Sequence, residues 1–161
     1  MATPQARKIR ETLMDGRLPD DECIARAVDM WPAEVRHEFA RVLLRRIVCR
    51  VLGRSGVPAW ELWAEGWLDR RDRTAAAAQA AADAAQRVVQ TADITNWPDS
   101  AMWADRARLV AEWIAAWTTD PAYSACVPAW GERAAGWPDD CIPAYERRQQ
   151  IADALELCRR S

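Results

Sequence analysis

A four-residue motif that occurs twice constrains the fold of this chain more than any other feature. Val57–Trp60 reads Val-Pro-Ala-Trp, and Val127–Trp130 repeats it 70 positions later. The same offset gives 12 identities over the 28 positions from 57 to 84, without a gap. Self-similarity at a fixed offset is typical of a chain built from duplicated structural units. We therefore expect two related units.

The match extends upstream, where Trp31-Pro32 corresponds to Trp97-Pro98 once a few loop residues are allowed. Each unit then consists of a helix opened by Trp-Pro, a loop, a short helix opened by Val-Pro-Ala-Trp, and a longer helix. Two copies are fewer than a solenoid usually needs, which favours a closed, pseudo-symmetric bundle. We predict a single domain over residues 1–161, with an N-terminal helical addition over 1–30, repeat unit 1 over 31–92 and repeat unit 2 over 97–160.

Proline and glycine divide the chain into segments with helical periodicity. The central segment, which ends near Gly53, places apolar residues on one stripe: Val35, Phe39, Val42, Leu43, Ile47 and Val51. The run from Thr74 to Gln90 is alanine-rich and has a high helix propensity. No segment alternates apolar and polar residues as a strand would. The prediction is an all-α, compact bundle of about seven or eight helices.

Composition narrows the class of protein. No apolar stretch approaches the ~20 residues that cross a bilayer, and residues 2–8 show no signal-peptide pattern, so we expect a cytoplasmic protein without membrane contact. The five cysteines are widely spaced and His37 is the only histidine, so we expect the cysteines to be small buried residues in a reducing cytosol, and we expect no metal site.

The sequence lacks the patterns of a recognisable enzyme. The sequence contains no Gly-x-Ser-x-Gly or comparable nucleophile turn for which His37 could act as the base, and it contains no glycine-rich phosphate loop. The acidic groups Asp20–Glu22 and Asp139-Asp140 stand beside prolines at helix starts, where carboxylates complement the helix dipole. We predict no catalytic residue and no cofactor.

Arginine is concentrated on the central segment. Residues 36–54 carry six Arg against one Glu, and a second cluster follows near residue 70. Such a helix either contacts nucleic-acid phosphates or an acidic protein, or is a solvated face laced with ion pairs. A net charge of −2 does not favour a dedicated nucleic-acid binder. The candidate partner-binding arginines are Arg41, Arg45, Arg46, Arg50, Arg70 and Arg71.

Ten of the thirteen aromatic residues are tryptophan, and six of the ten are accounted for by the duplication. Trp103, Trp113 and Trp117 follow helical spacing and are expected in the core. Trp60, Trp63 and Trp67 share one helix face. Either they belong to the core, or some of these rings are partly exposed for a partner, because three indoles from one short helix are more than a small core readily absorbs. Trp63 corresponds to Arg133 in the other copy, and it is the first candidate for a residue that binds a partner.

A resemblance rests on three stretches. Trp60–Asp69, the Asp72–Thr74 segment with its alanine run, and Tyr145–Gln150 resemble Ala/Trp-rich helical proteins of bacteria and their phages, some of which are described as immunity proteins. It covers about half of the chain. It implies an all-helical fold and hints at an immunity or inhibitor role.

Together these patterns favour a non-enzymatic bacterial or phage protein that binds and blocks a macromolecular partner, as an inhibitor, counter-defence or immunity protein. A protein partner is the first expectation, with nucleic acid on the Arg36–Arg54 helix as another. The alternative is a protein that binds a small anion or nucleotide with Trp and Arg from both repeats. The oligomeric state is not predicted.

Overall fold

The computed structural model describes residues 4–92, 99–135 and 143–160. Within these ranges the chain forms eight α-helices, one short 3-10 helix and no strand, which confirms the all-α prediction. Trp97-Pro98 and residues 136–142 of the second repeat copy lie outside the described residues. The helices are α1 (Pro4–Leu13), α2 (Asp20–Met30), α3 (Ala33–Val51), α4 (Pro58–Leu68), α5 (Ala75–Thr91), α6 (Asp99–Thr119), the 3-10 helix η1 (Pro121–Ala125), α7 (Val127–Ala135) and α8 (Pro143–Arg160).

The chain divides into two compact units. Unit 1 contains residues 1–46 and 122–161, and unit 2 contains residues 47–121. The single helix α3 therefore contributes to both units. The two compact units are defined by spatial packing, whereas the two repeat units are defined by matching residues in the sequence. The repeat units and the single domain therefore remain predictions.

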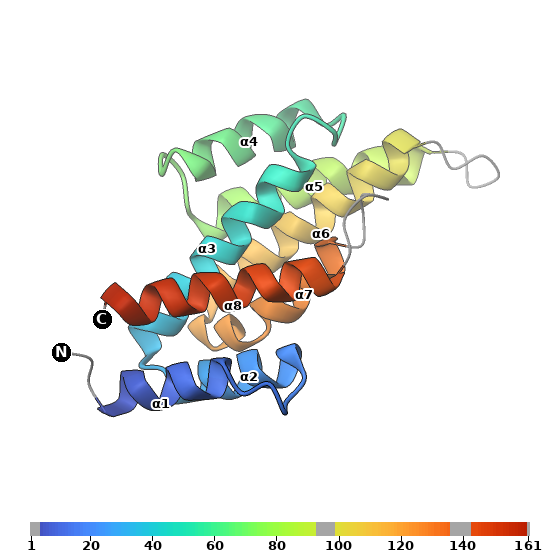
Figure 1. Ribbon diagram of the computed structural model, residues 1–161. Helices are drawn as coiled ribbons and strands as arrows, with labels where there is room; N and C mark the ends of the chain where they lie inside the picture. Colours follow the sequence, from blue (N-terminus) through green and yellow to red (C-terminus); the bar gives the residue numbers. More distant parts are fainter. Residues whose placement is uncertain (1–3, 93–98, 136–142, 161) are drawn as a thin grey trace. The chain divides into compact units, whose positions relative to one another are not determined.

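In unit 1, α1 packs on α2, both helices pack on α8, and α7 packs on α8 (Figure 1). The buried side chains include Ile9 and Leu13 from α1 and Ile24 from α2. Trp31 meets Phe39 edge to face, with ring centroids 5.1 Å apart. An apolar core of this kind holds the first and last parts of the chain together.

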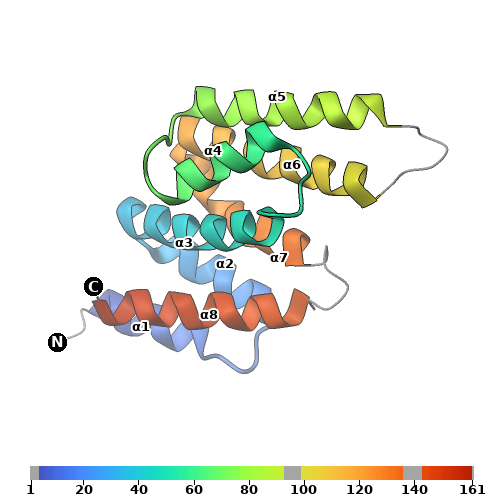
Figure 2. The same cartoon turned by 90° about the horizontal axis from the view of Figure 1, so that it is seen from above.

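In unit 2, α5 and α6 run antiparallel and lie side by side along most of their length (Figures 1 and 2). Both helices bury alanine, whose small side chain lets two helix backbones approach closely. The fully buried alanines of this pair are Ala78, Ala85, Ala104, Ala107 and Ala111. Helix α4 packs on α5 and buries Trp60 and Trp67 completely.

The Val-Pro-Ala-Trp motif opens a helix in both copies, as expected. Pro58 occupies the first turn of α4, where a missing N–H costs nothing. Glu61 holds the loop before α4, because its carboxylate accepts hydrogen bonds from Gly53 N at 2.8 Å and Ser55 N at 3.2 Å. Thr74 caps α5 by accepting from Ala77 N at 3.2 Å.

Candidate functional site

A groove of ≈ 400 Å³ lies between α4 and α5, within unit 2. Its walls are mostly small or apolar side chains, and Arg71 and Asp72 stand at one end. Leu62 on α4 borders the groove and remains 69% exposed. The lining residues are Ala59, Leu62, Trp63, Gly66, Arg71, Asp72, Ala77, Ala80 and Ala81.

Trp63 forms one wall of this groove. Its ring meets Trp60 edge to face at 5.8 Å between centroids, and only 8% of the residue is exposed. The alternative in which some tryptophans of α4 are partly exposed is therefore wrong, since Trp60 and Trp67 are also buried. Their indoles fill the interior of unit 2, which alanine side chains would leave underpacked. Among the residues that line the groove, the exposed large apolar side chain is Leu62, which sequence reasoning did not single out.

The segment after α4 carries Arg70 and Arg71, and of these two predicted arginines Arg71 lines the groove. Arg70 N and Arg71 N donate to Trp67 O and Gly66 O at 3.2 and 2.8 Å, which is the Schellman pattern of a helix end. Arg70 takes the left-handed position of this motif, with φ 64°. Both side chains are exposed, and Arg71 pairs with Asp69 at 3.0 Å.

The predicted basic helix is rich in internal partners. Arg41 pairs with Glu38, one turn earlier on α3. Arg45 is exposed and Arg50 half-buried, and each interacts with other groups of the chain. Arg54, just beyond α3, lies over the Trp103 ring with 5.1 Å to its centroid. These contacts favour the ion-paired interpretation of the helix over a surface kept free for phosphates.

Trp103 differs from the expectation that it belongs to the core. The residue is only partly buried, and the Arg106 guanidinium lies over the same ring as that of Arg54, at 4.4 Å from the centroid. Trp113 and Trp117 are buried, as expected.

Arg46 belongs to a polar cluster inside unit 1. Its guanidinium pairs with Glu146 at 2.7 Å and also with Asp153, both on α8. Glu146 is 1% exposed, so the pair is largely removed from water. Gln150 extends the cluster by donating to Pro128 O at 3.0 Å. This geometry gives Arg46 a structural role, and its predicted contact with a partner remains untested.

Two positions that line the groove in the first repeat copy carry an ion pair in the second copy. At the offset of 70, Leu62 corresponds to Glu132 and Ala77 to Arg147. Glu132 and Arg147 form an ion pair at 3.2 Å that bridges α7 and α8. In the first copy both positions are apolar and line the groove. The two copies therefore share a helix pair but differ in the chemistry between the helices.

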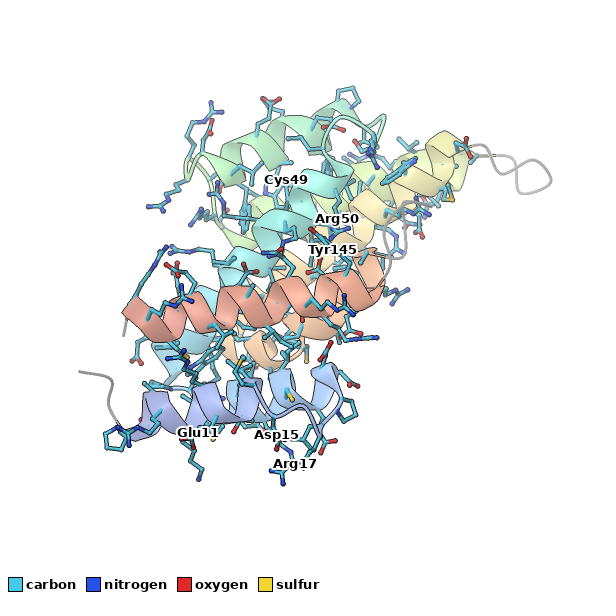
Figure 3. All side chains as sticks on the ribbon, in the orientation of Figure 1. Glu11, Asp15, Arg17, Cys49, Arg50 and Tyr145 are labelled. Carbon is cyan, nitrogen blue, oxygen red and sulfur yellow. The ribbon has the colours of Figure 1, made fainter. Side chains whose placement is uncertain are left out.

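A second hollow, on unit 1, is charged. It measures ≈ 310 Å³ and is lined by Lys8, Glu11, Thr12, Asp15 and Arg17. Figure 3 labels Glu11, Asp15 and Arg17, along α1 and the loop that follows it. The Arg17 side chain donates to Asp15 at 3.0 Å and lowers the pKa of that carboxyl. Arg17 and Asp15 thus satisfy one another on an exposed surface, and this hollow points to no particular ligand.

Among the described residues, no three His, Cys, Asp or Glu side chains gather in a metal-binding arrangement. No helix among them has the length and apolar character needed to cross a membrane. Comparison with known proteins finds no matching family model, no similar curated protein and no similar solved structure.

Proposed function

We propose that the chain is a non-enzymatic binding protein that docks on a protein partner through the α4–α5 groove. The observation that carries the proposal is an apolar groove bordered by Leu62, which is 69% exposed. A large apolar side chain beside a hollow is the arrangement that a docking partner would cover. The role we propose is that of an inhibitor, such as an immunity or counter-defence protein, in line with the resemblance of the Trp60–Asp69 stretch.

The difference between the two repeat copies supports this assignment. The Glu132–Arg147 ion pair occupies the α7–α8 position that corresponds to the groove. If both helix pairs had only a structural role, an ion pair like Glu132–Arg147 could stabilise each of them. Apolar side chains at Leu62 and Ala77 leave one copy available for contact.

Photo-crosslinking tests the proposal. Benzoylphenylalanine replaces Leu62 in one version of the full chain and Met14 in another, because Met14 is equally exposed at 65% but lies on the other unit. We expect irradiation of the cells that make the protein to give one adduct of defined mass from position 62 and none from position 14. The adduct is identified by mass spectrometry, and the identified protein is purified and rebound.

Leu62→Glu should then weaken the reconstituted complex by about ten-fold or more, as expected for an apolar anchor. Unchanged affinity, or equal crosslinking from positions 62 and 14, would contradict the proposal.

A small anionic ligand is the second candidate. It is favoured by the groove volume of ≈ 400 Å³, within the usual range of ligand pockets, and by Arg71 in its lining. This candidate predicts a thermal shift with nucleotides and a change in Trp fluorescence that Trp63→Phe reduces. Absence of both signals excludes it and leaves the protein partner.

A further inference from the structure

We propose that Arg54, Trp103 and Arg106 form a binding site for a phosphate monoester, which the two guanidiniums hold. All three residues belong to unit 2, and none of them lines the α4–α5 groove. The site is therefore separate from the groove, and neither proposal depends on the other.

The Trp103 ring brings two cations together. Arg54 Cζ lies 5.1 Å and Arg106 Cζ lies 4.4 Å from the centroid of this one ring. Because both distances end at the same point, the two guanidiniums are within about 10 Å of each other, roughly the screening length in 0.1 M salt. The ring attracts both cations, while the cations repel each other. An anion that contacts both guanidiniums would remove this repulsion.

The two arginines keep N–H donors for such an anion. Within the described residues, the exposed side chain of Arg54 contacts the Trp103 ring and makes no ion pair or hydrogen bond. An aromatic ring attracts a guanidinium but offers its five N–H donors no oxygen acceptor. Arg106 is half-buried on α6 and donates to Met102 Sδ at 3.4 Å, and sulfur is a weak acceptor. The site thus combines an anchored arginine with an exposed one.

The acidic residues nearest in sequence to these arginines are engaged elsewhere. Glu61 accepts from the backbone N–H groups on either side of Arg54, at 2.8 and 3.2 Å. Asp105, which precedes Arg106, pairs with Arg108 at 2.7 Å. Neither carboxylate is recorded as a partner of the two guanidiniums, which favours an anion from outside the chain.

The charge of the pair selects the class of ligand. Two guanidiniums carry two positive charges, and a phosphate monoester carries close to two negative charges at neutral pH. Its three terminal oxygens can accept from both guanidiniums, whereas the two oxygens of a carboxylate match a single guanidinium fork. A phosphate monoester therefore fits the pair better than a carboxylate does. Its source is either a free phosphate ester or a phosphorylated protein side chain.

Calorimetric titration of the full chain tests the site. At pH 7.5 and constant ionic strength, inorganic phosphate should bind with a Kd of about 1 mM or lower, and acetate should bind about ten-fold more weakly or not at all. Arg54→Gln and Arg106→Gln should each weaken phosphate binding about five- to ten-fold, because each removes one of the two charge-assisted contacts. Since Arg54 is exposed, Arg54→Gln keeps the test valid if Arg106→Gln fails to fold.

Two further variants separate a built site from general electrostatic attraction. Arg87→Gln makes the same charge change on an exposed residue of α5 in the same unit, and should leave phosphate affinity within about two-fold. Arg54→Lys keeps the charge but lacks the planar fork, and should bind phosphate about three-fold more weakly than the unmodified chain. Circular dichroism of each variant shows whether it is folded.

Two phosphate esters distinguish the sources. AMP is compared with adenosine, and a phosphoserine peptide is compared with its unphosphorylated form. Binding of AMP more tightly than inorganic phosphate indicates a free ester, and tighter binding of the phosphopeptide indicates a phosphorylated protein. Adenosine and the unphosphorylated peptide should bind neither the unmodified chain nor its variants.

Several results would overturn the proposal. One is the absence of binding at about 10 mM phosphate, and another is equal binding of phosphate and acetate. Unchanged affinity of Arg54→Gln, or an equal loss in Arg87→Gln, would show that Trp103 and its two arginines do not form the site. The crosslinking test of the groove stands apart from each of these outcomes.

Discussion

At the scale of single residues, Arg46 shows how a sequence can suggest an interface where the fold has an internal pair. On α3 it is one of several arginines, which made it a candidate for partner contact. Its two carboxylate partners lie 100 and 107 positions away in the chain. Reading one segment cannot predict such partners, because only the packing of unit 1 brings α8 beside this part of α3.

Arg46→Ala should therefore destabilise the protein. Removing the guanidinium leaves the buried Glu146 carboxylate without its ion-pair partner, and breaking such a pair costs about 3 kcal/mol. Urea unfolding followed by circular dichroism measures the free energy of unfolding. The matched control is Arg41→Ala, whose more exposed pair with Glu38 is worth only about 0.5 kcal/mol. Equal losses for the two variants would contradict the structural role of Arg46.

Cysteine reactivity provides a second test at this scale. Burial raises the pKa of the Cys23 thiol, and it also raises the pKa of Cys158, whose sulfur is near Trp31. The thiolate is the reactive form, so a raised pKa leaves less of it at pH 7.5. Cys49 and Cys126 are exposed, so the expectation that the cysteines are buried is wrong for these two. Iodoacetamide should modify Cys49 and Cys126 several-fold faster than Cys23 and Cys158.

Peptide-resolved mass spectrometry over time gives the four rates. The same reaction in urea is the control, since unfolding should make the rates converge. Cys23 or Cys158 reacting among the first in the folded protein would show that the core of unit 1 is wrongly described.

At the scale of elements, the helices were largely predictable because their signals are local. Pro58 and Thr74 mark the starts of α4 and α5, and alanine content alone indicates a helix over most of 75–91. The 3-10 helix at Pro121–Ala125 was not predicted, since it is too short to show a period.

The groove was less predictable than the helices. Its existence depends on how α4 packs against α5, which is a tertiary property. The mismatch of Trp63 with Arg133 did draw attention to a residue that lines the groove. Sequence reasoning overestimated the exposure of Trp63, because it could not show that three indoles fit inside unit 2.

The close pairing of α5 and α6 makes a prediction about volume. Ala85 is fully buried on α5, so a leucine there would overpack the interior of unit 2 at a cost of about 1–3 kcal/mol. Ala85→Leu should lower the urea midpoint accordingly. Ala76→Leu adds the same atoms at an exposed position of α5, and should change stability by no more than about 0.5 kcal/mol. Similar effects of the two substitutions would contradict the alanine-mediated packing.

At the scale of the whole molecule, the two units differ in how they use the chain. Unit 2 is continuous, whereas unit 1 combines residues 1–46 with residues 122–161. A chain that ends at residue 121 should keep slow amide exchange in α5 and α6 but lose protection in α1 and α2, because α8 is missing. Hydrogen exchange read by mass spectrometry distinguishes these helices. Persistent protection of α1 and α2 would show that they fold without the C-terminal segment.

The composition of unit 1 also sets an order of events during synthesis. Residues 1–46 leave the ribosome before unit 2, yet α8, which packs on α1 and α2, is translated after it. The end of α8 at residue 160 comes 114 positions after residue 46, so at ~5–20 residues per second the apolar side chains Ile9, Leu13 and Ile24 are made roughly 6–23 s before α8 is complete. Unit 2 can be completed in that interval. Residues 1–46 are therefore made before unit 2 but stay accessible to proteases and chaperones until α8 has been made.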